Sequence, residues 1–172
     1  QIGLEMAKRG RGFEMDVCYY SSTRHPDVED SLGLTYCADL ETILTQADFL
    51  SIHAPMNEDT RGMIGKMELR CMKSTAILIN SARGPIVDNY ALYEALRDGV
   101  IAGAGIDVTD PEPIPFDHPL LTLPNVVITP HIGSATLATR RGMALMAARN
   151  ILDRLNDRQM ETCLNPEVFN RC

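Results

Sequence analysis

The chain has 172 residues, enough for one domain with a buried core, and it carries a formal net charge of −7 with an isoelectric point near 5.0. This acidic balance argues against nucleic-acid backbones and anionic membrane surfaces as main partners. No apolar run approaches the roughly 20 residues that span a bilayer. The five scattered cysteines form no C-x-x-C pair, which indicates free thiols in a reducing compartment rather than a disulfide framework or a metal site.

The first residue is glutamine, and the segment after it has the pattern of a helix already under way. We therefore expect the true N-terminus, with any targeting signal, to lie upstream. A cytoplasmic location is the expectation for the part that is present.

Apolar spacing and turn residues predict an alternation of helices and strands. Helices are expected over Ile2–Lys8 (broken by Gly10 and Gly12), Leu40–Gln46 (capped by Asp39), Gly65–Met72, Asp88 to Gly99, and Ala135–Leu155 (capped by Ser134). Strands are expected over Met15–Ser21, Leu34–Tyr36, Phe49–Ala54, Ala76–Asn80, Ile101–Val108, and from Val126 up to Pro130. Ser22–Ser31 and Asp110–Pro124 contain prolines and are expected to be loops, and the polar tail from Arg158 an extended connection that leaves the domain.

Strands alternating with helices predict an α/β fold, a doubly wound parallel sheet with helices on both faces. Most of the strands are apolar throughout, which is typical of a sheet covered on both sides. In such sheets ligands bind at the carboxyl ends of the strands. The residues that follow the predicted strands are Ser21, Ser22 and Arg24, then Ala54 and Pro55, then Ser81, Ala82 and Arg83, then Asp107 and Glu112, and finally His131. These residues would all lie at one edge of the sheet, which is hard to explain if they are unrelated turn residues.

Four of these side chains have chemistry that fits one reaction. Arg83 can hold a carboxylate with its guanidinium fork and polarise an adjacent carbonyl, although a lone loop arginine is more often only solvated. His131 can transfer a proton near neutral pH or merely satisfy a turn. Glu112, fixed between two prolines, can orient and tune that histidine or be an exposed turn acid. Asp107 can orient an amide group of a cofactor ring or cap a turn.

The hydride source for such a reaction is indicated by remnants of a dinucleotide site. Gln1-Ile2-Gly3 before a helix matches the end of a glycine fingerprint, in which a pyrophosphate lies over the helix N-terminus. No acid follows the next strand directly, where it would accept ribose hydroxyls, but Arg24 is present. This favours a 2′-phosphate and hence NADP over NAD, with an ordinary loop arginine and NAD as the alternative.

Four stretches carry a family resemblance: Ile79–Asp88 (INSARGPIVD), Gly105–Pro113 (GIDVTDPEP), His118–Leu123 (HPLLTL) and Asn125–Thr136 (NVVITPHIGSAT). In this order they resemble the D-2-hydroxyacid dehydrogenase family, and within it most of all the glyoxylate/hydroxypyruvate reductases. The resemblance covers nearly the whole chain. It implies a Rossmann-like domain over residues 1–157, with residues 158–172 leading back to a substrate domain, and a homodimer at full length.

The resemblance also implies residue roles. Arg83 would anchor the substrate, Glu112 would partner the histidine, His131 would be the acid/base, and Asp107 would lie near the nicotinamide. Cofactor contacts would fall on Gln1, Ile2, Ala54, Pro55, Thr60, Ser81, Ala82, Gly133 and Ser134. The implied reaction is reduction of glyoxylate or hydroxypyruvate, with phosphoglycerate, lactate or formate dehydrogenase as alternatives inside the family. A rival from another class is a non-catalytic, corepressor-like dinucleotide sensor, which would not need Arg83, Glu112 and His131 together.

The sequence departs from the family at its start. The first, central strand of the dinucleotide-binding sheet and most of the substrate domain would precede Gln1. Without that strand the sheet would split into two halves with unpaired inner edges. We therefore expect the 172 residues to be a fragment that is inactive and poorly folded on its own.

Overall fold

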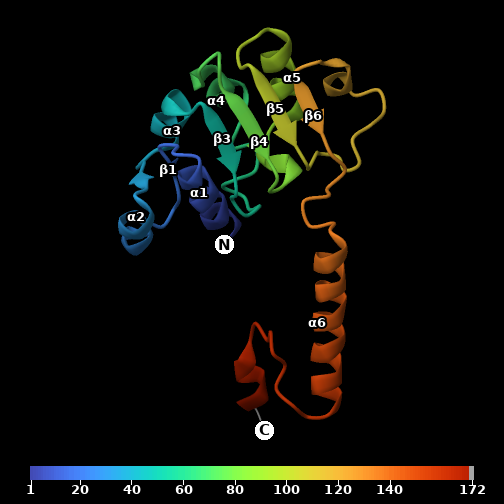
Figure 1. Cartoon of the computed structure of the whole chain (residues 1–172). Coiled ribbons are helices and arrows are strands. Elements are labelled where there is room, and N and C mark those ends of the chain that lie inside the picture. The colour runs from blue at the N-terminus through green and yellow to red at the C-terminus, as the bar shows by residue number, and fades with distance from the viewer. Residues whose placement is uncertain (171–172) are drawn as a thin grey trace. The chain divides into compact units, whose positions relative to one another are not determined.

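The computed structural model describes residues 1–170 and divides into two compact units, Gln1–Pro130 and His131–Cys172 (Figure 1). The predicted division between residues 157 and 158 stays a prediction. Each unit is described by itself.

The first unit alternates helices and parallel strands in the expected order (Figure 1). Its helices are α1 (Ile2–Gly12), α2 (Pro26–Leu32), α3 (Leu40–Gln46), α4 (Lys66–Cys71) and α5 (Asn89–Arg97), with the short 3-10 helices η1 (Gly84–Ile86) and η2 (Pro119–Thr122). Its strands are β1 (Cys18–Tyr19), β2 (Thr35–Tyr36), β3 (Phe49–Ile52), β4 (Ile77–Asn80), β5 (Gly103–Ile106) and β6 (Val126–Ile128). The predicted α/β class is confirmed.

The strands form two separate parallel sheets among the described residues, β1-β2 and β3-β4-β5-β6. In the first, Cys18 pairs with Thr35. In the second, Phe49 of β3 pairs with Ile77 of β4, and Ile77 pairs with Gly103 of β5. The prediction of two half-sheets with unpaired edges is thus confirmed. Because all four strands of the larger sheet are parallel, their carboxyl ends meet at one edge, where ligands bind in such folds.

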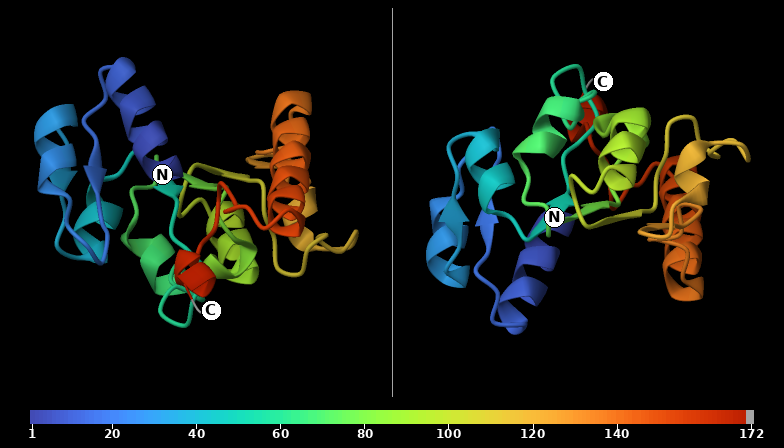
Figure 2. Two further views of the ribbon diagram at one scale, coloured as in Figure 1. Left: turned by 90° about the horizontal axis from the view of Figure 1, so that it is seen from below. Right: turned by 90° about the horizontal axis from the view of Figure 1, so that it is seen from above.

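The hydrophobic core of the unit lies on one face of the larger sheet. Figure 2 shows α3, α4 and α5 on one side of the strands and α1 on the other. Leu50, Leu78 and Ile106 are buried on the helical side, together with Leu69 of α4 and Leu92 of α5.

Burial alternates along each strand of the larger sheet, and the opposite face is less covered. Phe49 is 53% exposed there and Val127 66% exposed. Within this unit the second face therefore has α1 beside it and stays partly exposed. Strands that are apolar on both faces need a layer on each side, and the first unit provides a closed layer on one.

Three local predictions are wrong for identifiable reasons. α1 continues through Gly10 and Gly12, since a glycine costs a helix only about 1 kcal/mol. The expected loop Ser22–Ser31 instead contains α2, which has the ordinary signals of a helix: proline in its first turn, and Gly33 with a left-handed φ of 64° behind it. Thr136 rather than Ser134 caps the last helix, because its side chain accepts a hydrogen bond from the backbone of Thr139.

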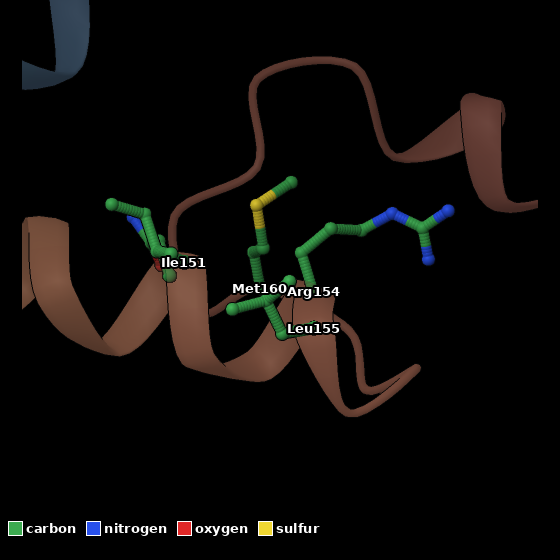
Figure 3. A pocket seen from close by; sticks show the side chains of 5 residues that line it. Ile151, Arg154, Leu155 and Met160 are labelled. Atoms are coloured by element: carbon green, nitrogen blue, oxygen red, sulfur yellow. The ribbon is translucent and has the colours of Figure 1, made fainter.

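The second unit consists of α6 (Leu137–Leu155), the segment that folds back after it, and η3 (Pro166–Asn170). The amide of Asn150 donates to the hydroxyl of Thr162 at 2.6 Å. A hollow of about 300 Å³ lies against α6, lined by Asn150, Ile151, Arg154, Leu155 and Met160 (Figure 3). The tail therefore returns to the helix instead of leaving it as an extended segment. α6 buries none of its residues.

None of the helices in residues 1–170 is long and apolar enough to cross a membrane.

Candidate active site

The residues that follow the strands of the larger sheet lie at its carboxyl edge, within the first unit. Ala54 and Pro55 follow β3, Ser81 to Arg83 follow β4, and Asp107 follows β5. The strand pairing brings these ends side by side. It does so as the sequence predicts, since Asn80 at the end of β4 pairs with Ile106 at the end of β5.

Asn80 fixes the loop that carries Arg83. This side chain is 1% exposed, and its carbonyl oxygen accepts from the backbone N–H of Ala82 at 3.1 Å. Its amide donates to the carbonyl of Arg83 at 3.0 Å. A buried amide that satisfies both of its functions on one loop holds that loop in one conformation. Arg83 itself is exposed, so its guanidinium is accessible to an anion.

Gly84 brings the Arg83 loop against the loop that carries Glu112. A Cβ on Gly84 would lie 2.0 Å from the carbonyl oxygen of Thr109. The hydroxyl of Thr109 in turn donates to the carbonyl of Pro111 at 2.9 Å, and the amide of Asn89 donates to the carbonyl of Asp110 at 3.0 Å. Two of the predicted catalytic residues therefore stand on loops in direct backbone contact.

A hollow of about 190 Å³ opens at the ends of β4, β5 and β6. Its lining consists of Ile79, Asn80, Ser81, Gly105, Ile106, Asp107, Val127 and Thr129. The hydroxyl of Thr129 donates to a carboxylate oxygen of Asp107 at 2.5 Å. A carboxylate beside an apolar, glycine-floored hollow suits a flat ring that carries an amide group, which is the chemistry expected of Asp107.

His131, Gly133 and Ser134 belong to the second unit. His131 follows the end of β6 by three residues in the chain and is exposed. Its φ is 55°, in the left-handed region. Non-glycine residues adopt this conformation rarely, and such outliers cluster at functional sites.

The start of α1 lies against the end of β3. Gln1 is the N-cap of α1, followed by Ile2 and Gly3. A Cβ on Gly3 would stand 3.3 Å from the Cβ of His53, so this glycine allows a close approach. Ser51 and the ring of His53 share a hydrogen bond of 2.9 Å. Burial lowers the pKa of His53.

Thr60 closes the loop after β3. Its hydroxyl donates to the carbonyl of Pro55 at 2.7 Å, and the backbone N–H of Asn57 donates to that hydroxyl at 2.9 Å. The loop Ala54–Thr60 is thus tied back on itself beside the strand end.

Arg24 lies in a network after β1. Its Nε and Nη2 donate to the carboxylate of Glu29, the shortest contact being 2.7 Å. The hydroxyl of Tyr19 donates to the same carboxylate at 2.7 Å, and the guanidinium carbon stands 5.4 Å from the ring centre of Tyr36. Ser21 and Ser22 lie between β1 and Arg24, and the backbone N–H of Thr23 donates to the hydroxyl of Ser21 at 3.4 Å.

Four residues that shape the strand ends are absent from the sequence predictions: Asn80, Thr129 and His53 in the larger sheet, and Glu29 beside the smaller one. The strand-end rule already pointed to the neighbourhood of the first three, because Asn80 and Thr129 end predicted strands and His53 lies one residue before the end of Phe49–Ala54. Glu29 had no such signal, since it reaches Arg24 only because Pro26–Leu32 is a helix. Among the described residues, no three His, Cys, Asp or Glu side chains gather as a metal site.

Comparison with known proteins identifies the family. The family profile of the D-isomer specific 2-hydroxyacid dehydrogenases, NAD binding domain, matches residues 1–133. The chain belongs to the D-isomer specific 2-hydroxyacid dehydrogenases. The matched part is the NAD binding domain of that family, and its fold is Rossmann-like, as the sequence motifs predict.

Among curated relatives, the chain is 50% identical over 170 residues to glyoxylate/hydroxypyruvate reductase B of Yersinia pestis (strain Pestoides F). The match takes in 98% of this chain and 52% of the relative. The chain therefore spans about half the length of the curated relatives it matches.

Solved structures match this chain with a similar share of their length. A protein of Thermus thermophilus is 46% identical, with a TM-score of 0.88 over 95% of this chain and 50% of that one. The NADPH-dependent glyoxylate/hydroxypyruvate reductase of Sinorhizobium meliloti, in complex with NADP and malonate, is 32% identical. Its TM-score is 0.86, over 96% of this chain and 50% of that one.

Proposed function

We propose that the protein carrying this chain reduces a small 2-oxo acid, glyoxylate or hydroxypyruvate, to the 2-hydroxy acid. The contact of Gly84 with Thr109 carries the proposal, because it places the Arg83 loop against the Glu112 loop beside the hollow at Asp107. The relatives from Yersinia and Sinorhizobium, which are glyoxylate/hydroxypyruvate reductases by name, support the substrate class.

The residues divide the chemistry as follows. Arg83 binds the carboxylate of the 2-oxo acid through its guanidinium fork and polarises the adjacent carbonyl. His131 gives a proton to the carbonyl oxygen, and Glu112 orients and tunes that imidazole. The reduced dinucleotide, when bound, supplies the hydride.

The dinucleotide would be held along the carboxyl edge. Asp107 and the floor at Gly105 fit the nicotinamide end, and the N-terminus of α1 at Gln1, Ile2 and Gly3 fits the pyrophosphate. Further contacts are assigned to Ala54, Pro55, Thr60, Ser81, Ala82, Gly133 and Ser134. Ser21, Ser22 and Arg24 would meet the adenosine ribose, and the arginine favours NADP over NAD.

Residues 1–157 are assigned to the dinucleotide-binding domain, residues 158–172 to the connection back to a substrate domain, and the full-length protein to a homodimer in the cytoplasm. These assignments rest on the family.

Steady-state oxidation of NADPH by glyoxylate, measured in the full-length protein, tests the proposal. His131→Ala should lower kcat by about 10²- to 10⁴-fold while leaving the Kd for NADPH unchanged. Arg83→Gln should act mainly through the glyoxylate KM, and Arg70→Gln, an exposed arginine of α4 away from the site, should match the parent.

Two results would argue against these roles. Equal losses of turnover and cofactor affinity in His131→Ala would contradict the proton-donor role. NADPH binding without any 2-oxo acid reduction would favour the non-catalytic sensor instead.

A further inference from the structure

Arg24 forms an ion pair with one acid, Glu29, which belongs to the neighbouring helix α2. The Glu29 side chain is 11% exposed, whereas that of Arg24 is 60% exposed. Both oxygens of Glu29 are engaged, since Oε1 accepts from Tyr19 and from Arg24 Nε, and Oε2 accepts from Arg24 Nη2 at 2.7 Å. The acid is thus fixed and the arginine is presented to solvent.

The ion pair leaves the arginine with one guanidinium nitrogen for an incoming anion. Nε and Nη2 face Glu29, while Nη1 makes no hydrogen bond within residues 1–170. The plane of the guanidinium is also held by the Tyr36 ring, 5.4 Å from its carbon. Arg24 would therefore keep its place even without the charge of Glu29.

The Arg24 and Tyr19 contacts stabilise the charged form of the acid. Hydrogen bonds from Arg24 first, and from Tyr19 second, lower the pKa of Glu29. Glu29 is accordingly an anion at neutral pH. A cation with an anion at 2.7 Å acts at longer range as a dipole, so its attraction for a phosphate is weakened.

We propose that Glu29 limits the selectivity of this site for a 2′-phosphorylated dinucleotide, by offsetting the positive charge of Arg24. The inference rests on the proposed cofactor role of Arg24. A 2′-phosphate carries close to two negative charges at neutral pH and is repelled by the nearby carboxylate, whereas the ribose hydroxyl of NADH has no charge to repel. Glu29 therefore narrows the difference between NADPH and NADH, and the site accepts both.

The test is the ratio of the Kd for NADH to the Kd for NADPH, measured by fluorescence titration of the full-length protein. Glu29→Gln keeps the size of the side chain and an acceptor oxygen but removes the charge. It should raise this ratio about two- to fivefold, the value of one exposed ion pair. The rise should shrink at high salt, because exposed charges are screened.

Two matched variants separate charge from structure. Tyr19→Phe removes a hydrogen bond from Glu29 without changing any charge, so its ratio should equal that of the parent. If the variant only loosened the loop that carries Arg24, the binding of both dinucleotides would weaken equally, and the ratio of the two Kd values would not change. Arg24→Gln should lower the ratio below that of the parent.

The outcomes distinguish the two proposals. An unchanged or lower ratio in Glu29→Gln, or an equal rise in Tyr19→Phe, would overturn the role of Glu29. Dinucleotide binding without reduction of glyoxylate would overturn the proposed reaction and leave the ratio test intact. No binding of either dinucleotide would overturn both.

Discussion

Gly84 differs from the other glycines of the first unit because a Cβ there would lie within 3.0 Å of backbone atoms. The carbonyl oxygen and carbon of Thr109 would lie 2.0 and 2.2 Å from a Cβ at this position. A flexible side chain could move away from a new methyl group, but a backbone in a loop tied by Asn89 and Thr109 cannot move cheaply.

Gly84→Ala should therefore destabilise the full-length protein by about 3 kcal/mol, at the upper end of overpacking costs. The same shift should displace Arg83 and raise the KM for glyoxylate. Urea unfolding with an unchanged m-value measures the loss of stability. Gly12→Ala, where a Cβ meets nothing within 4 Å, is the matched control and should cost nothing. A Gly84→Ala variant as stable as the parent would show that the two loops are not in tight contact.

At the scale of single residues, the rule that ligands bind at strand ends predicted most of the residues at the carboxyl edge of the larger sheet. Arg83 and Asp107 follow buried strands, and the structure places both at the carboxyl edge of the sheet. Asn80 was counted only as a strand residue, because sequence alone does not show that its amide is buried and turned to the loop. Glu29 was missed because its contact with Arg24 depends on a helix that was not predicted.

At the scale of the elements, the start of helix α5 contacts the loop that carries Glu112. Asp88 caps it by accepting from the backbone N–H groups of Tyr90 and Ala91 at 2.9 and 3.0 Å. The next residue, Asn89, donates to the carbonyl of Asp110 in the Glu112 loop. The start of the helix therefore holds both its own first turn and part of the candidate site.

Asp88→Ala should lower the free energy of unfolding by about 1 kcal/mol, because two backbone donors lose their acceptor. Asp88→Asn keeps an acceptor oxygen and should retain most of the stability. Thermal and urea unfolding of the full-length protein measure both. Equal losses in the two variants would mean that the charge, rather than the cap, stabilises α5.

Elements with a strong local signal were predicted well. Asp39 caps α3 over Leu40–Gln46 as expected, and its side chain accepts from the backbone of Thr42 at 2.6 Å. α2 was missed since polar residues and a proline suggested a loop, although proline at the first position is itself a helix signal. The length of α1 was underestimated because two glycines were given more weight than their cost justifies.

At the scale of the whole molecule, the strands of the first unit form two sheets rather than one. β1 and β3 each pair with a single neighbour among the described residues, so each has an edge of backbone groups without a strand partner. In the second unit α6 buries no residue, and Leu137 and Leu155 are 90% and 74% exposed. Both features leave much apolar and backbone surface in water.

The 172-residue chain expressed alone should therefore melt without a cooperative transition and should not reduce glyoxylate. Differential scanning calorimetry and an NADPH oxidation assay are the measurements. A single sharp heat-absorption peak together with measurable turnover would contradict this expectation.

The α/β class, the parallel pairing and the split sheet were predictable because they follow from strand order and from the apolar period. How much of each sheet face is covered was not, since burial depends on which elements pack against it. The apolar sequence predicts that the sheet face with Phe49 and Val127 is buried, but this face is partly exposed in the first unit.

Gly105 lines the hollow at the ends of β4, β5 and β6, and its surroundings differ from those of Gly84. A Cβ at Gly105 would meet no heavy atom within 4 Å in the described part of the chain, so the fold does not require a glycine there. A methyl group would instead occupy space in the hollow itself. A screen that selects for folding would thus pass alanine at Gly105 and reject it at Gly84. A screen that selects for turnover would reject both, and comparing the two screens would separate the glycine that shapes the protein from the one that makes room for its ligand.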